Sequence, residues 1–148
     1  MLQSGARGRK TARFQAGESL GLSIRGIPEL IRQVMRGFSY QVLPTFASNS
    51  GMSLEAVAGT IGIPQRTLAR RKASGRLAPE ESERLLRVSS IFEKAVDLFE
   101  GDVPSAVNWL SAPKRALENR SPLQYAGTEI GAREVENLIG RLEHGVFS

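Results

Sequence analysis

The sequence contains no cysteine among its 148 residues. Disulfides, thiolate zinc sites and cysteine nucleophiles are therefore excluded, and this composition fits a protein of the reducing cytoplasm. No run of about 18 apolar residues occurs, so we expect no segment to span a membrane. The start, MLQSGARGRKTARF, is basic but lacks the apolar core of a signal peptide. We expect residues 1–20 to form a flexible basic arm.

Strand signals are also scarce, because the sequence has neither an Asn-Gly or Asp-Gly turn nor a long alternation of polar and apolar residues. Helical spacing recurs instead, as in the apolar positions Val135, Leu138, Ile139 and Leu142. Pro44 leaves the segment SYQVLPTFASNSG ambiguous, since proline disrupts a helix interior. The sequence predicts an all-α fold.

Charge divides the chain into two parts. Residues 1–79 hold 12 Lys or Arg against 3 Asp or Glu, a net of +9, and residues 80–148 hold 8 against 12, a net of −4. A basic segment favours a polyanionic partner, which would repel an acidic segment. The two parts are therefore predicted to have different functions.

The segment SLEAVAGTIGIPQRTLARRKASG has the pattern of two short helices joined by a tight turn. Ser53 can cap the first helix, and Pro64 can begin the second, where its missing N–H costs no hydrogen bond. Helix–turn–helix packing favours a small residue in the first helix, a glycine at the turn and an aliphatic residue in the second. Ala58, Gly62 and Leu68 fit that pattern.

The second of these helices displays polar and then basic side chains. We predict that six of its residues contact DNA: Gln65, Arg66, Thr67, Arg70, Arg71 and Lys72. Glutamine can read adenine and arginine can read guanine, while the later basic side chains suit phosphates. The alternative is a solvated basic face, because the motif fixes few positions. The glycine turn and the basic charge favour DNA, and such helices usually read a repeated operator as a dimer.

Groups suited to catalysis are few. His144 is the only histidine, and no glycine-rich phosphate loop follows a predicted strand. Glu134 and Glu136 are two residues apart on a predicted helix and so point in different directions. A histidine near a helix C-terminus is favoured there when protonated, which explains His144 without chemistry. We expect no enzyme, no cofactor and no metal site, and a DNA-binding enzyme that uses His144 is the least favoured alternative.

An ordered series of short motifs runs through the second half. It consists of LFEGD, Ala106 with NWL, Pro113, Ala116–Leu117, SPL at Ser121–Leu123, T-E-x-G at Thr128–Gly131, and a final Val135, Leu138, Arg141 and Gly145. In this order the motifs resemble the toxin-binding domain of the Xre/MbcA/ParS family of antitoxins. Upstream, IGIPQRTLARRKASGRLAPEESERLLR resembles the family's Xre-like segment. The family often has a glycine-containing turn where this chain has LENRSP, and Asn119 can adopt the same left-handed conformation.

The resemblance implies a type II antitoxin. An Xre/Cro-like helix–turn–helix would occupy residues 21–77, and a small helical toxin-binding domain would occupy residues 78–148. The family's partner is commonly a toxin with a RES domain, which resembles ADP-ribosyltransferase folds and acts on NAD. NAD would then be the toxin's substrate and not a cofactor of this chain. The antitoxin would form a homodimer and a higher hetero-oligomer with the toxin, bind its own promoter DNA and block the toxin's NAD pocket.

The end of the chain is the part that we expect to touch the toxin. The predicted contacts are Arg141, His144, Gly145, Val146, Phe147 and Ser148. Val146 and Phe147 are apolar, and little chain remains to cover them, whereas Trp109 and Leu110 are expected in the intramolecular core. An alternative function is a stand-alone transcription regulator whose C-terminal domain binds a small ligand or only dimerises.

Overall fold

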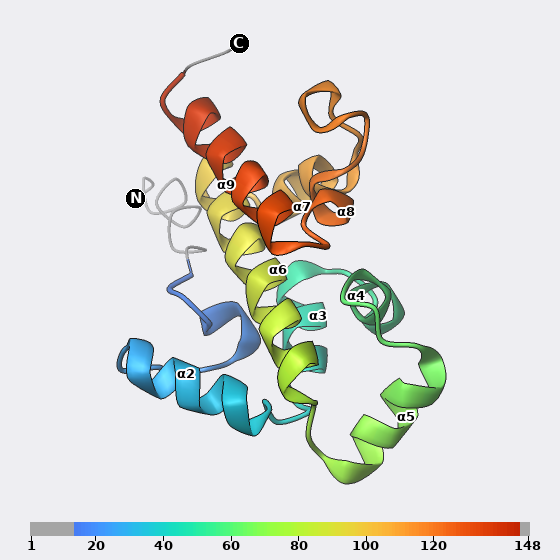
Figure 1. Cartoon of the computed structure of the whole chain (residues 1–148). Coiled ribbons are helices and arrows are strands. Elements are labelled where there is room, and N and C mark those ends of the chain that lie inside the picture. The colour runs from blue at the N-terminus through green and yellow to red at the C-terminus, as the bar shows by residue number, and fades with distance from the viewer. Residues whose placement is uncertain (1–13, 146–148) are drawn as a thin grey trace, which may run out of the picture.

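The computed structural model describes residues 14–145, which fold as packed helices (Figure 1). In chain order they are η1 (Glu18–Leu20), α2 (Ile27–Arg36), α3 (Val42–Ser50), α4 (Leu54–Thr60), α5 (Gln65–Ser74), α6 (Pro79–Leu98), α7 (Val103–Ser111), η2 (Arg115–Leu117), α8 (Pro122–Tyr125) and α9 (Glu129–Glu143). Within this range the β pairing is limited to two isolated bridges. The predicted all-α fold is confirmed.

The long helix α6 runs through the middle of the molecule (Figure 1). Pro79 lies in its first turn, and the apolar stripe that includes Leu85, Phe92 and Ala95 is buried. The helix packs against α2 and η1 from the N-terminal half and against α7 and α9 from the C-terminal half. The boundary that we expected between residues 77 and 78 therefore falls at the start of a helix that both halves share.

The segment that precedes α2 packs against the body of the protein. Leu20 is buried, and the ring of Phe14 lies 5.6 Å from that of Phe92, measured between centroids. The backbone N–H and the hydroxyl of Ser19 both donate to the buried carboxylate of Glu93. The expectation of a flexible arm over residues 1–20 is therefore wrong for residues 14–20, and residues 1–13 lie outside the described range.

The segment that Pro44 left ambiguous forms helix α3. Pro44 is the third residue of α3, within the first turn, where a backbone N–H has no partner inside the helix. Leu43 and Phe46 are buried, and the Phe46 ring meets Phe92 edge to face at 5.2 Å. The proline is therefore compatible with the helix because it lies near its start.

Candidate nucleic-acid interface and C-terminal binding region

Helix α5 carries the residues that we predicted to contact DNA, and it lies at one end of the molecule (Figure 1). Gln65, Arg66, Arg70 and Lys72 are exposed, and Thr67 is half-buried. An Nη of Arg70 lies 3.4 Å from the Thr67 hydroxyl, so these side chains share one face of α5. The described structure thus leaves this polar and basic face open to a large partner.

The turn before α5 has the geometry that the sequence predicted. Gly62 has a φ of +75°, a left-handed conformation that favours glycine. Ala58 and Leu68 are both buried between the helices, and the Ile63 N–H donates to the Ala58 carbonyl at 2.8 Å. The small residue, the glycine and the aliphatic residue therefore have their expected packing roles.

Both ends of α5 are tied to the rest of the fold. Before the helix, Arg84 of α6 donates from Nε to the carbonyl of Ile61 at 2.7 Å. After the helix, the Tyr40 N–H donates to the Gly75 carbonyl and the Leu77 N–H to the Phe38 carbonyl, each at 2.9 Å. These contacts fix the direction in which α5 presents its side chains.

Arg71 differs from the other predicted DNA contacts. Its Nε and one Nη donate to the two carboxylate oxygens of Glu81, at 2.8 and 3.0 Å. These hydrogen bonds raise the pKa of Arg71. Burial opposes ionisation of Glu81, but the bonds from Arg71 and from the Ala78 N–H outweigh burial and lower the pKa of Glu81. The geometry therefore gives Arg71 a role in fixing α5 to α6, and the phosphate contact that we expected of it stays a prediction.

The T-E-x-G motif at the start of α9 has a structural explanation. Thr128 caps the helix, because its hydroxyl accepts the Gly131 N–H at 3.0 Å. A side chain at Gly131 would overlap the carbonyl oxygen of Tyr125 in α8. The glycine thus permits the close approach of α8 and α9.

The turn before α8 contains two consecutive residues in the left-handed conformation. Glu118 has a φ of +59° and Asn119 a φ of +63°. Ser121 then caps α8 in a reciprocal arrangement with Gln124, at 3.0 and 3.1 Å. The left-handed turn expected at Asn119 is confirmed.

Sequence reasoning missed a basic site next to the only tryptophan. Leu110 is buried as expected, but Trp109 is half-buried, and the Lys114 ammonium lies 4.9 Å from the centroid of its ring. Burial lowers the pKa of Lys114. The guanidinium of Arg120 similarly lies 5.7 Å from the Tyr125 ring. The closeness in sequence of Lys114 to Trp109 and of Arg120 to Tyr125 was a possible signal of these contacts. The net negative charge of residues 80–148 led us to overlook it.

The C-terminal end of α9 lies far from α5 (Figure 1). His144 is exposed and follows the last turn of α9, and its backbone N–H donates to the Gly140 carbonyl. Gly145 ends the helix with a φ of +72°, as predicted, and Arg141 is half-buried. The predicted contacts at residues 146–148 lie outside the described residues.

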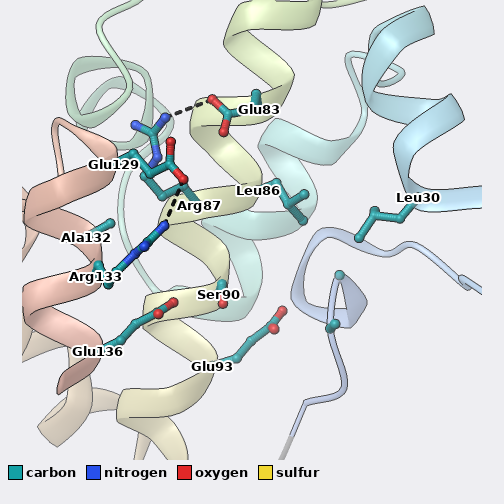
Figure 2. A pocket seen from close by; sticks show the side chains of 12 residues that line it. Leu30, Glu83, Leu86, Arg87, Ser90, Glu93, Glu129, Ala132, Arg133 and Glu136 are labelled. Carbon is teal, nitrogen blue, oxygen red and sulfur yellow. Dashed lines mark hydrogen bonds and ion pairs between the residues drawn. The ribbon is translucent and has the colours of Figure 1, made fainter. Parts of the chain in front are cut away.

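A hollow of about 300 Å³ lies between α6, α9, α2 and the segment before η1. Figure 2 shows Leu86 of α6 on its wall and two ion pairs at its edge. Arg87 pairs with Glu83 at 2.8 Å, and Arg133 pairs with Glu129 at 3.1 Å. Glu93 and Glu136 also line the hollow, so its acidic side chains outnumber its basic ones by four to two.

Two features of residues 14–145 bear on other functional classes. No group of three or more His, Asp or Glu side chains in this range has the arrangement of a metal site. No helix in this range is both long and apolar enough to cross a membrane.

Two family models match the chain, and together they cover most of the described residues. The antitoxin Xre-like helix-turn-helix domain matches residues 29–90. The antitoxin Xre/MbcA/ParS C-terminal toxin-binding domain matches residues 94–145. The two matches meet within α6, consistent with a helix that belongs to both halves.

Three relatives named Antitoxin Xre are similar to this chain over more than half of its length. A protein of Yersinia enterocolitica is 44% identical over 120 residues, which are 80% of this chain and 81% of that protein. A protein of Photorhabdus laumondii is 42% identical over 88 residues, 59% of this chain and 60% of its own. A protein of Pseudomonas putida is 34% identical over 84 residues, 56% of this chain and 52% of its own. The chain therefore belongs to the Xre family of antitoxins, with an N-terminal helix–turn–helix and a C-terminal toxin-binding domain.

Proposed function

We propose that this antitoxin neutralises a cognate RES-domain toxin with its C-terminal region and represses its own promoter through α5. The observation that carries this proposal is the placement of two candidate binding surfaces at opposite ends of α6 (Figure 1). A partner at one end leaves the other end accessible, so one chain can hold DNA and toxin together. A promoter target places this activity in the cytoplasm.

At the DNA end, α5 would enter the major groove with its first turn against base edges. Gln65 and Arg66 are exposed in that turn and are the proposed base contacts. Arg70 and Lys72 are the proposed phosphate contacts, because they are exposed one to two turns later. Arg71 supports them indirectly through its ion pair with Glu81.

At the toxin end, the proposed mechanism is occlusion without chemistry by the antitoxin itself. Arg141, His144 and Gly145 would lie against the toxin, and residues 146–148 would enter its NAD pocket. The match of residues 94–145 to a toxin-binding domain supports this assignment. The exposed end of α9 supports it further, because that end can be covered without disturbing the core.

Arginine substitutions on α5 test the DNA assignment. We expect Arg66→Ala and Arg70→Ala to lose retention of promoter DNA in a gel-shift assay while they still co-purify with the toxin. Arg133→Ala is the matched control, since Arg133 is an exposed arginine on α9 that pairs only across one turn with Glu129. Unchanged promoter binding by both α5 variants would show that another surface reads the DNA.

Removal of residues 146–148 tests the toxin assignment. We expect the shortened chain to fold, to bind promoter DNA normally and to lose protection of cells that express the neighbouring RES-domain toxin. A shortened chain that protects fully would refute the role of the tail. If no neighbouring product co-purifies with the intact chain and no toxicity is relieved, the antitoxin proposal fails and a stand-alone regulator replaces it.

A further inference from the structure

Helix α2 carries a group of arginines that the proposed contacts on α5 leave unexplained. Arg32 and Arg36 lie one turn apart on the helix, so they share one of its faces. Arg25, just before the helix, lines the same open hollow of about 550 Å³ as these two residues. All three side chains are exposed. We call these three residues the α2 stripe.

The α2 stripe points away from the body of the protein. Leu30 and Val34 pack against the core cluster, and each lies two residues before an arginine of the stripe. Side chains two residues apart on a helix do not share a face, so Arg32 and Arg36 are directed toward solvent. Substitutions at these arginines therefore leave the packing of α2 against the core intact.

The positive charge of the stripe is not neutralised by other described residues. Every ion pair within residues 14–145 joins side chains from α5 onward, and none includes an arginine of the stripe. Glu29 is the one acidic residue of α2, and its carboxylate accepts the Arg25 backbone N–H at 3.0 Å and the Gln33 amide at 3.4 Å. Three cations against one carboxylate give a surface that attracts an anion.

The α2 stripe and α5 belong to one end of the molecule. Figure 1 shows α2 and α5 at the same end, away from the C-terminal end of α9. The two helices also end beside each other, because Arg76, which follows α5, donates to the carbonyl of Gly37, which follows α2, at 2.6 Å. Arg76 is exposed, so it continues the positive charge from Arg36 on α2 toward Lys72 on α5.

We propose that the α2 stripe binds the phosphate backbone of duplex DNA beside the groove that α5 enters. This inference rests on the proposed operator binding by α5. The guanidinium group of arginine matches the geometry of a phosphate, and phosphate contacts fix the orientation of a protein on the duplex while base edges supply the sequence information. The stripe therefore strengthens binding and orients α5 without adding a sequence preference.

A DNA duplex fits the stripe better than a toxin or a single small anion does. The toxin-binding model matches residues 94–145, and α2 lies outside that range. The ten residues of α2 correspond to a length of about 15 Å, which exceeds one phosphate group and suits a row of them. A phosphate backbone supplies that row at regular intervals.

The salt dependence of promoter binding by the full chain gives the first test. Each phosphate contact adds about 0.9 to the slope of log K against log salt concentration. We expect the double variant Arg32→Gln/Arg36→Gln to bind promoter DNA more weakly, with a slope shallower by about 1.8. Its deficit should therefore shrink about tenfold between about 50 and about 200 mM salt. The matched control is Arg115→Gln/Arg133→Gln, which removes the same charge from exposed positions in the C-terminal half and should keep the wild-type slope.

Comparison with a scrambled duplex gives the second test, because it separates phosphate contacts from base contacts. Arg32→Gln/Arg36→Gln should lose the same factor in affinity for promoter and scrambled DNA, whereas Arg66→Ala should lose more for the promoter. Arg32→Lys/Arg36→Lys should restore the salt slope, since lysine keeps the charge. Circular dichroism checks that each variant is folded. A wild-type slope in the folded double glutamine variant would overturn the inference.

The same assays separate this inference from the proposed function. If Arg66→Ala and Arg70→Ala bind the promoter normally while the double glutamine variant has a shallower slope, the α5 assignment fails and the stripe remains a DNA-binding surface. If the double glutamine variant keeps the wild-type slope while Arg66→Ala loses the promoter, the α5 assignment stands and the stripe inference fails. Loss of toxin co-purification by the double glutamine variant, with an unchanged slope, would assign the stripe to the toxin instead.

Discussion

Replacement of Gly131 by alanine tests the packing of α8 against α9. A β-carbon at Gly131 would overlap the Tyr125 carbonyl oxygen and lie 2.9 Å from the carbonyl carbon. Both atoms belong to the backbone, so a side-chain rotation cannot relieve the contact. The start of α9 would have to move away from α8.

Gly140 in the same helix provides the control, because a β-carbon there meets no atom within 4 Å. Alanine is favoured over glycine within a helix by about 1 kcal/mol, so Gly140→Ala should be stabilising by up to that amount. The overlap at Gly131 costs about 3 kcal/mol, the upper part of the range for overpacking. After the gain in helix propensity, Gly131→Ala should be destabilised by about 2 kcal/mol.

Thermal unfolding followed by circular dichroism measures both effects. For a protein of this size, 1 kcal/mol shifts the midpoint by about 2–4 °C. We expect Gly131→Ala to unfold about 4–8 °C below the wild type and Gly140→Ala to unfold about 2–4 °C above it. Equal shifts for the two variants, or a stabilised Gly131→Ala, would refute the argument that Gly131 is required for the approach to Tyr125.

Three further predictions concern glutamate residues, two through their carboxylates and one through its backbone conformation. Burial raises the pKa of Glu93 despite its hydrogen bonds from Ser19, so its contribution to stability is lost as the pH rises through that raised pKa. Urea unfolding should therefore show Glu93→Gln gaining on the wild type as the pH increases from about 4.3, the ordinary value for glutamate. Glu81 has the opposite sign, because its lowered pKa gives stability that is lost as the pH falls through that pKa. Glu81→Gln should unfold at lower urea than the wild type at pH 7, and the difference should vanish in acid; a pH-independent difference would contradict the ion pair with Arg71. Glu118→Gly should raise stability by about 0.5–1 kcal/mol, since Glu118 has a φ of +59°, and an unchanged urea midpoint would contradict this.

Local signals in the sequence predicted much of the fold. The glycine at Gly62, the cap at Ser53 and the helix end at Gly145 depend on neighbouring residues, and the structure has all three as expected. Leu68 could also be placed, because helical spacing shows which side of a short helix is buried. Such features need no knowledge of distant parts of the chain.

Long-range pairing could not be predicted in the same way. Glu81 had a sufficient local explanation at a helix start, so nothing indicated that it would hold Arg71, ten residues earlier. The attachment of Ser19 to Glu93 spans 74 residues, and Phe14 lies next to a basic segment that suggested disorder. The exposure of Ile27, Ile31 and Met35 on α2 could not be predicted either, since an apolar pattern does not show which of its residues face the core.

The shared helix α6 makes this antitoxin difficult to divide. Its 20 residues correspond to a helix about 30 Å long, and apolar side chains from both halves pack along it. If the chain is divided at either end of α6, one of the two halves loses the helix against which it packs. Neither half is therefore expected to be a stable fragment by itself. Exchange of specificity between relatives would then succeed only when the crossover lies inside α6 and preserves its buried stripe. The DNA-binding half and the toxin-binding half are therefore expected to be inherited together.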